Sequence, residues 1–256
     1  MMRLLFFAIL LHSSVFMSGQ IGHSLEQFEG AIIRGDTVRK NIALVFTGDE
    51  YADGGEFIKG ILEEDSIKAS FFLTGNFYRD PGNASLIRTL KADGHYLGAH
   101  SDRHLLYCDW NNRDSLLVDY DEFSIDIDNN YRAMQHFGIE KEDAGYFLPP
   151  YEWYNKRISL WCSKKGLLLV NYTPGTMSHT DYTTPDMSNY RSSEDIYDSI
   201  IKYEMDSEHR LNGFILLIHI GSSPLRTDKF YYLLDDLIIE LVKKGYNFCR
   251  IDNLLE

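Results

Sequence analysis

Cysteine is scarce in this 256-residue chain, which has three cysteines far apart in sequence and no Cys-x-x-Cys pair. Cys108, Cys162 and Cys249 therefore cannot form a disulfide framework, and they lack the spacing of a structural zinc site or a redox dithiol. We interpret them as small apolar core residues, although an oxidising compartment would allow one disulfide.

Positive charge is also in short supply. The chain has 25 Lys and Arg residues against 38 Asp and Glu residues, which gives a formal net charge of −13. A partner such as nucleic acid or an anionic membrane requires a basic surface that displaces counterions. The composition thus argues against both partners and favours a neutral or cationic substrate.

Long apolar runs are missing beyond the N-terminus, where nothing approaches the ~18 residues of a spanning helix, so we expect no membrane insertion. The N-terminus itself has Arg3, an apolar run from Leu4 to Leu11, and small or polar residues at 18–20. This layout predicts a signal peptide over residues 1–19 and export to the periplasm or the extracellular space, with a buried N-terminal helix as the alternative.

No linker rich in Pro, Gly or Ser divides the chain, so we expect an N-terminal extension over residues 20–40 and one domain over residues 41–256. Hydrophobic periodicity in that domain predicts short buried strands that alternate with amphipathic helices. The predicted strands cover residues 42–46, 69–73, 96–99, 146–148, 167–170, 213–218 and 247–251. The predicted helices cover residues 57–62, 86–90, 119–137, 154–165 and 231–244, and one more begins near Ser193.

The pattern amounts to about seven strand–helix units and predicts an α/β fold. Either a distorted or incomplete (β/α) barrel or a doubly wound sheet would fit, and we prefer the barrel. In both architectures the loops at the carboxyl ends of the strands carry the chemistry. Polar residues that follow a predicted strand are therefore the candidates for a functional site.

Two carboxylates, Asp49 and Glu50, follow the first predicted strand. Adjacent carboxylates point in different directions, so one could bind a metal while the other takes a proton. A helix N-cap within a solvated acidic loop is the alternative.

Histidines follow two other strands. His100 and His104 have i, i+4 spacing, which on a helical turn would place both imidazoles on one face, where they could bind one metal ion. His219 ends the most apolar strand of the chain and could act as a general acid, because histidine titrates near neutral pH. Ordinary surface or core histidines are the alternative for all three.

Two further strand ends carry candidate groups. Pro149 and Pro150 restrict the backbone ahead of Tyr151, whose amide could donate to an oxyanion, although the same residues could form a plain rigid loop. Asn171 could bind substrate or begin a turn.

Taken together, these residues resemble the polysaccharide deacetylase family, carbohydrate esterase family 4, which contains the NodB-homology domain and removes acetyl groups from N-acetylated sugars. The resemblance covers Asn41 to Leu255 and places a polysaccharide deacetylase-like catalytic domain over residues 41–256. The matching segments, in family order, are Thr47-Gly48-Asp49-Glu50, Ala69 to Asn76, His100-Ser101-Asp102-Arg103-His104, Leu148-Pro149-Pro150-Tyr151, Leu217-Ile218-His219 and Lys244-Gly245-Tyr246.

The resemblance implies a role for each matching position. Asp49 would be the general base, His219 the acid that protonates the leaving amine, and the Tyr151 amide the oxyanion donor. His100, His104 and Glu50 would hold a divalent metal, zinc by preference with cobalt or nickel as substitutes, which would activate water. Tyr151, Leu217 and Asn171 would bind substrate.

The chain departs from the family pattern at three places. Glu50 stands where the family has the Asp ligand and is one methylene longer. Leu148 stands where the family has an arginine that positions the catalytic Asp. The family's fourth motif, with an aspartate and a tryptophan, is not recognisable between Val170 and Tyr182.

The function implied is hydrolysis of the N-acetyl group of a GlcNAc-containing glycan or oligosaccharide. An O-acetyl esterase acting on acetylated polysaccharide uses the same site and is one alternative. A carbohydrate-binding homologue with weakened catalysis is another. The sequence leaves the oligomeric state open.

Overall fold

The computed structural model describes residues 25–256, so the predicted signal peptide over residues 1–19 lies outside the described part of the chain. The strands are β1 (Glu26–Phe28), β2 (Ala31–Arg34), β3 (Asn41–Gly48), β4 (Ser70–Leu73), β5 (Tyr96–Ala99), β6 (Tyr146–Phe147), β7 (Leu168–Leu169), β8 (Phe214–His219) and β9 (Asn247–Cys249). The α-helices are α1 (Gly55–Glu64), α2 (Gly75–Arg79), α3 (Ala84–Ala92), α4 (Tyr120–Gln135), α5 (Lys156–Lys164), α6 (Ser193–Asp206), α7 (Leu234–Lys243) and α8 (Ile251–Leu255). Short 3-10 turns are η1 (Pro81–Asn83), η2 (Lys141–Asp143), η3 (Pro150–Glu152), η4 (Ser178–Thr180) and η5 (Phe230–Leu233).

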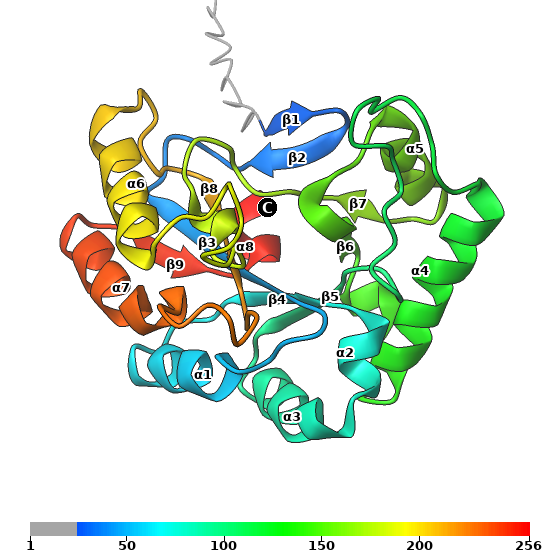
Figure 1. The fold of residues 1–256 in the computed structure, drawn as a ribbon, viewed down its shortest axis with the longest axis horizontal. Helices are drawn as coiled ribbons and strands as arrows, with labels where there is room; N and C mark the ends of the chain where they lie inside the picture. Colours follow the sequence, from blue (N-terminus) through cyan, green and yellow to red (C-terminus); the bar gives the residue numbers. More distant parts are fainter. Residues whose placement is uncertain (1–24) are drawn as a thin grey trace, which may run out of the picture.

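All nine strands belong to one curled sheet with the order β1-β2-β8-β3-β4-β5-β6-β7, and β9 pairs with β3 beside that path. Strands β3 to β9 pair in parallel, as helical crossovers require. Figure 1 shows helices α1 to α7 in a ring around the strands, with α8 near the centre of the view. The predicted distorted or incomplete (β/α) barrel is thus confirmed, and all seven predicted strands are present.

Two hydrophobic clusters form the core, and period-2 alternation along β3 divides the strand between them. Ile42, Leu44 and Phe46 belong to the cluster that packs under the helices. Ala43 and Val45 belong to the second cluster, which fills the inside of the curled sheet. Both faces of β3 are buried, which is why its sequence is continuously apolar rather than alternating.

The β1–β2 hairpin was not predicted, and it shows that part of the N-terminal extension belongs to the sheet. In Figure 1 the hairpin occupies the arc between α5 and α6. β2 pairs antiparallel with β8, and on its other side Ile32 forms a bridge with Val170, just after β7. The hairpin therefore spans the gap that would otherwise separate the two ends of the parallel sheet.

Side-chain caps fix the ends of the helices that flank the site. Asp119 and Glu122 form a capping box at the start of α4, and Ser192 and Asp195 form another at the start of α6. None of the helices within residues 25–256 is long and apolar enough to cross a membrane.

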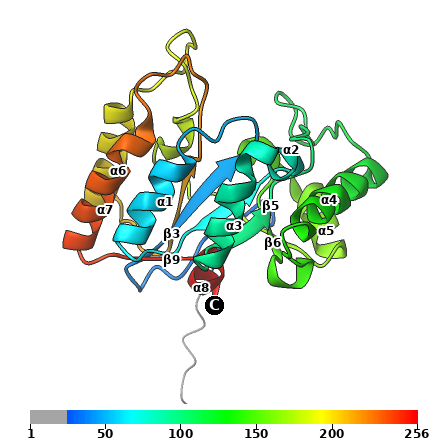
Figure 2. The same cartoon turned by 90° about the horizontal axis from the view of Figure 1, so that it is seen from below.

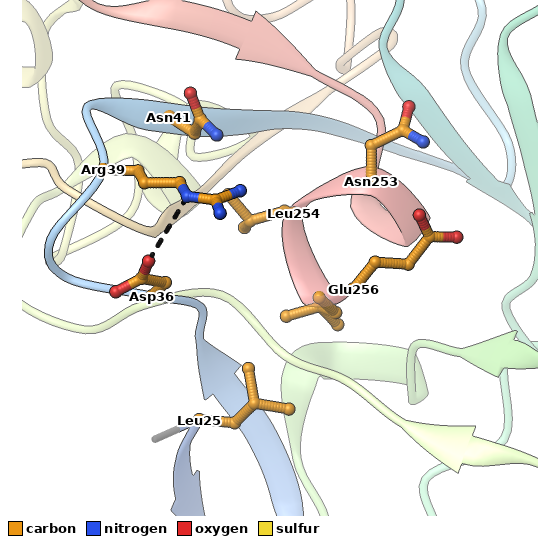
Figure 3. A pocket seen from close by; sticks show the side chains of 8 residues that line it. Leu25, Asp36, Arg39, Asn41, Asn253, Leu254 and Glu256 are labelled. Carbon is orange, nitrogen blue, oxygen red and sulfur yellow. Dashed lines mark ion pairs between the residues drawn. The ribbon is translucent and has the colours of Figure 1, made fainter. Parts of the chain in front are cut away.

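Cavities open at both ends of the barrel. Figure 2 shows α8 and the C-terminus at the end opposite to the one toward which β3 points. Near α8 a small cavity of about 100 Å³ lies against the amino end of β3, and it contains the Asp36–Arg39 ion pair (Figure 3). Its lining holds neither histidine nor cysteine, and the residues with candidate chemistry lie at the other end.

The way the N-terminal segment closes the barrel predicts that two of its arginines contribute unequally to the stability of the fold. Arg34 is 4% exposed and donates to the carbonyls of His209, Arg210 and Asn212 and to the Tyr203 hydroxyl. Arg34→Met should lower the free energy of unfolding by about 2 kcal/mol, because it removes these hydrogen bonds and leaves buried acceptors without a donor. Urea denaturation measures the change.

Arg39→Met is the matched control. The Arg39 side chain is 66% exposed and lies 3.7 Å from Asp36, so its loss should cost less than about 0.5 kcal/mol. Equal losses for the two variants would contradict the structural role assigned to Arg34.

Candidate active site

The register of the parallel strands brings the predicted groups to one edge of the sheet. Thr47 of β3 lies opposite His219 of β8, and Gly48 lies opposite Leu73 of β4. Leu73 in turn lies opposite Ala99, and Ala99 opposite Phe147. The next residues along each strand, Asp49, Thr74, His100 and Leu148, must therefore leave the sheet beside His219.

A cavity of about 620 Å³ opens at this edge. Six of the predicted site residues line it, namely Asp49, Glu50, His100, His104, Tyr151 and His219. Other lining residues, which the sequence analysis did not single out, include Trp110, Glu152, Tyr182, Asp186 and Met187. Residues from six separate segments thus converge on one space.

The His100 imidazole is buried and held in one orientation. Its Nδ1 lies 2.8 Å from the Leu148 carbonyl oxygen, and its backbone N–H donates to Leu73 and to the Asn130 side chain. Because a carbonyl only accepts, Nδ1 carries the proton and Nε2 keeps a free lone pair. Burial, with the nearby His104, holds the pKa of His100 well below its ordinary value, so the ring is neutral.

His104 lies beside His100, with 5.1 Å between ring centroids. The two rings are not brought together by a helical turn, since the chain from 101 to 106 is an irregular loop in which Ser101 and His104 adopt left-handed backbone angles, with φ of 75° and 54°. Burial lowers the pKa of His104 to about 4, against the opposing effect of Asp49. The two rings are thus neutral imidazoles, as metal ligation requires.

The Asp49 carboxylate is held by neutral donors. Its Oδ1 accepts from the Thr74 hydroxyl at 2.8 Å and from the Asn76 amide at 3.3 Å. Leu148, at the position of the family arginine, is fully buried and contributes only its carbonyl to His100. Thr74 and Asn76 thus orient Asp49, and no ion pair from residues 25–256 reaches its carboxylate.

The donor set fits a metal in part. His100 and His104 offer two neutral nitrogens, and the Leu148 carbonyl fixes one ring as outer-shell partners do. Glu50 lines the cavity on an exposed loop, but within residues 25–256 no three His, Cys, Asp or Glu side chains converge closely enough to hold one ion. The two imidazoles are preorganised, whereas the carboxylate ligand predicted at Glu50 is not.

His219 pairs with an aspartate that the sequence analysis missed. Asp181 follows η4, and its Oδ1 lies 2.6 Å from His219 Nδ1 while its Oδ2 accepts the His219 backbone N–H. Asp181 is the only carboxylate between Val170 and Tyr182, where the family's fourth motif was expected. That position was the available signal, and Tyr182, whose ring lies 5.2 Å from that of His219, occupies the aromatic position beside it.

The charge state of His219 differs from that of the other two histidines. Burial alone would lower its pKa, but the charge and hydrogen bond of Asp181, with the charge of Glu152, raise the pKa above its ordinary value. His104 and His179 also interact with the ring, and burial lowers the pKa of both. Of the three predicted site histidines, His219 is therefore the one whose environment favours the protonated form.

The turn after β6 is strained. Tyr151 and Glu152 both have left-handed backbone angles, with φ of 58° and 53°, which costs non-glycine residues about 1–3 kcal/mol each. The turn's hydrogen bonds run from Glu152 N–H to Pro149 and from Trp153 N–H to Pro150, and they do not use the Tyr151 N–H. The Tyr151 ring lies 4.3 Å from that of His104.

Two residues predicted to bind substrate lie elsewhere. Leu217 is fully buried inside the curled sheet, opposite Val45. Asn171 is 6% exposed and donates through its side chain to the Glu152 carbonyl at 2.9 Å. Neither lines the cavity, and Asn171 supports the strained turn instead.

Asp53 ties the Asp49 loop to the loop after β8. It accepts from the Ser222 N–H and the Tyr231 hydroxyl, and it pairs with Lys229 at 3.0 Å. Burial would raise the pKa of Asp53, but these donors hold the pKa below its ordinary value. The carboxylate thus joins the two loops that carry Glu50 and Ser222 on the cavity wall.

Comparison with known proteins places these features in a family. A family model described as polysaccharide deacetylase matches residues 34–170, more than half of the chain. The peptidoglycan-N-acetylmuramic acid deacetylase PdaA of Bacillus subtilis (strain 168) is 25% identical over 237 residues, which cover 92% of this chain and 79% of PdaA.

Solved structures share the fold at lower identity. The peptidoglycan N-acetylglucosamine deacetylase Bc1960 has a TM-score of 0.69 at 18% identity, over 87% of this chain and 91% of its own. BA3943 of Bacillus anthracis, a family 4 carbohydrate esterase pseudoenzyme, has a TM-score of 0.67 at 18% identity, over 90% of this chain and 70% of its own. The match of the family model, together with the fold, shows that this chain belongs to the polysaccharide deacetylase family.

Proposed function

We propose that the protein is an exported, metal-dependent hydrolase, periplasmic or extracellular, that removes the N-acetyl group of a GlcNAc-containing glycan. The observation that carries the proposal is the division of charge states in one cavity. Two imidazoles have lowered pKa values, a third has a raised pKa next to Asp181, and Asp49 lies with them. Hydrolysis of an amide needs this combination, because a base must activate water and an acid must protonate the amine.

His100 and His104 would hold the metal, with Asp49, Glu50 or water to complete its coordination. Zinc suits nitrogen and oxygen ligands, and cobalt or nickel could replace it. A divalent ion bound there would polarise the acetyl carbonyl and lower the pKa of water.

The chain's own groups would carry the proton transfers. Asp49, oriented by Thr74 and Asn76, would take a proton from the attacking water. The Tyr151 N–H, unused by the turn, would donate to the oxyanion. His219 would give its proton to the departing amine, while Asp181 stabilises the imidazolium.

The cavity wall suits a sugar. Trp110, Tyr151 and Tyr182 line it and are between about two-fifths and half exposed, so part of each side chain is open to solvent beside the reacting groups. Aromatic faces of this kind pack against the apolar faces of sugar rings. An acetylated carbohydrate is therefore the substrate we propose.

Two other functions are compatible with the same site. An O-acetyl ester would use the same groups and needs less protonation of its leaving group, so an esterase acting on acetylated polysaccharide is the second candidate. The absence of a converged third ligand within residues 25–256, together with the pseudoenzyme among the structural neighbours, supports a carbohydrate-binding homologue as the third.

Acetate release tests the proposal directly. Chitooligosaccharides, peptidoglycan and acetylated plant glycans should be screened with zinc or cobalt, and the activity should stop with EDTA and return with metal. Asp49→Asn should lower kcat about 100-fold or more, because the general base is lost. Asp128→Asn, a surface carboxylate paired with Lys165, is the matched control.

Full activity of the Asp49→Asn variant would show that the assigned base is wrong. If the protein binds one of these glycans but releases acetate from none of the tested substrates, the carbohydrate-binding homologue is favoured.

The pH dependence of kcat tests the His219–Asp181 pair. Asp181 raises the pKa of His219, so the protonated acid persists at neutral pH and disappears as the pH rises through that pKa. Asp181→Asn removes this effect, and the alkaline limb of the kcat profile should shift to lower pH. An unchanged alkaline limb with reduced activity would mean that Asp181 serves only the structure.

The leaving group separates the two enzymatic functions. His219→Ala should reduce cleavage of an N-acetyl substrate much more than cleavage of an O-acetyl ester, since an alkoxide departs with less help from an acid than an amine does. Rates on an N-acetylated and an O-acetylated oligosaccharide measure the difference. Equal losses on both substrates would remove His219 from the role of leaving-group acid.

A further inference from the structure

The ionisable side chains that the structure describes on the cavity wall include carboxylates but no lysine or arginine. Among residues 25–256, those that line the cavity include four carboxylates, Asp49, Glu50, Glu152 and Asp186, and no lysine or arginine. A substrate that carries its own carboxylate would find no cationic side chain on this wall.

Arg103, on the loop between His100 and His104, is exposed and does not line the cavity. Four other cations of the neighbouring loops are held by other groups. Lys229 pairs with Asp53 and donates to the Ser222 and Ser223 carbonyls, and Arg79 pairs with Asp102. Arg113 stacks on the Trp153 ring at 3.6 Å, and Arg226 is fully buried against backbone carbonyls. Each would have to break these contacts to reach the cavity.

Two of the four carboxylates have a compensating charge in the proposed reaction. A divalent metal would offset Asp49 and Glu50, while Asp181, behind the wall, is offset by protonated His219. Among residues 25–256 no ion pair reaches Glu152 or Asp186, although the charge of His219 also acts on Glu152. The cavity therefore stays neutral to negative in its working state.

Glu152 is the carboxylate best placed to contact a sugar near the reacting groups. Its side chain lines the cavity, and its charge acts on both His219 and the neighbouring tyrosines Tyr172 and Tyr182. No hydrogen bond from the described residues reaches its carboxyl group, whereas its backbone carbonyl is fixed by Asn171. Burial raises the pKa of Glu152 to about 7, as expected for a carboxyl group without donors.

We propose that Glu152 is a specificity-determining residue, which accepts a hydrogen bond from a hydroxyl or amine of the sugar and excludes N-acetylated sugars that carry a carboxylate. The substrate class is then a neutral or amine-bearing N-acetylhexosamine glycan, and acidic sugars such as N-acetylmuramic acid are rejected. This inference rests on the proposed deacetylation for its kinetic test, but substrate binding tests it independently.

The experiment compares two substrates that differ only in charge. One is a muramic-acid-containing glycan strand with free lactyl carboxylates, and the other is the same strand with those carboxylates converted to amides. With zinc present and at about pH 8.5, where Glu152 is ionised, the wild-type kcat/KM should be about 30-fold or more higher on the amide form, because like charges repel at short range. Glu152→Gln should bring the two values close together, and Glu152→Lys should favour the acid form.

Glu56→Lys is the matched control, because it makes the same change of net charge on an exposed position of α1. It should preserve the wild-type ratio. A ratio that shifts equally in Glu56→Lys and Glu152→Lys would trace the selectivity to overall charge and overturn the proposal.

Binding separates the failure of this inference from the failure of the proposed function. Calorimetry on the Asp49→Asn variant, with and without Glu152→Gln, measures affinity for both strands without turnover. Selective binding that Glu152→Gln abolishes supports the role of Glu152 even if no acetate is ever released. Acetate release with a ratio unchanged in Glu152→Gln would support the deacetylase and overturn the role of Glu152.

Discussion

The parallel pairing of β3 with β8 and β4 is the constraint on which the rest of the site depends. It places Thr47 beside His219 and Gly48 beside Leu73, so the residue that follows each strand emerges at the same edge. A slip of one residue in this register would turn the inward-facing side chains outward and bury polar groups in the core. The continuous apolar sequence of β3 and β8 opposes such a slip only weakly, since both faces are buried. The β2 hairpin, which pairs with β8 and bridges to Val170, adds a second constraint on the same strand.

Within that frame, burial gives the three histidines of the cavity opposite properties. His100 and His104 lose charge when they are taken from water, because no carboxylate of the described residues hydrogen-bonds to their rings. His219 is also taken largely out of water, with 21% of its side chain exposed, but Asp181 contacts it through both carboxylate oxygens and outweighs the cost of burial. Neutral nitrogens that can bind a metal and a protonated nitrogen that can serve as an acid thus coexist in one cavity. The difference lies chiefly in the charge and the hydrogen bonds of Asp181, to which the charge of Glu152 adds.

The sequence predicted the strands and the groups at their ends well, because both depend on local patterns of apolar residues and on motif order. It predicted less where tertiary contacts decide. The i, i+4 spacing of His100 and His104 suggested a helical turn, yet a loop with two left-handed residues brings the rings together. Asp181 lies on an irregular segment whose partner is 38 residues away, and no periodicity marks such a pair. The β1–β2 hairpin escaped prediction because its strands are short and β1 is exposed.

The strained turn at Tyr151 and Glu152 links catalysis to specificity. Two left-handed residues in succession persist only where the surroundings fix them, and here Pro149 and Pro150 restrict the chain before them while Asn171 holds the Glu152 carbonyl. The same backbone geometry leaves the Tyr151 N–H without an internal partner and puts the Glu152 carboxyl on the cavity wall. The oxyanion donor and the group that would sense substrate charge are therefore adjacent residues on one rigid element. A change that relaxes this turn would alter rate and selectivity together, whereas a change confined to the Glu152 carboxyl would alter selectivity through charge alone.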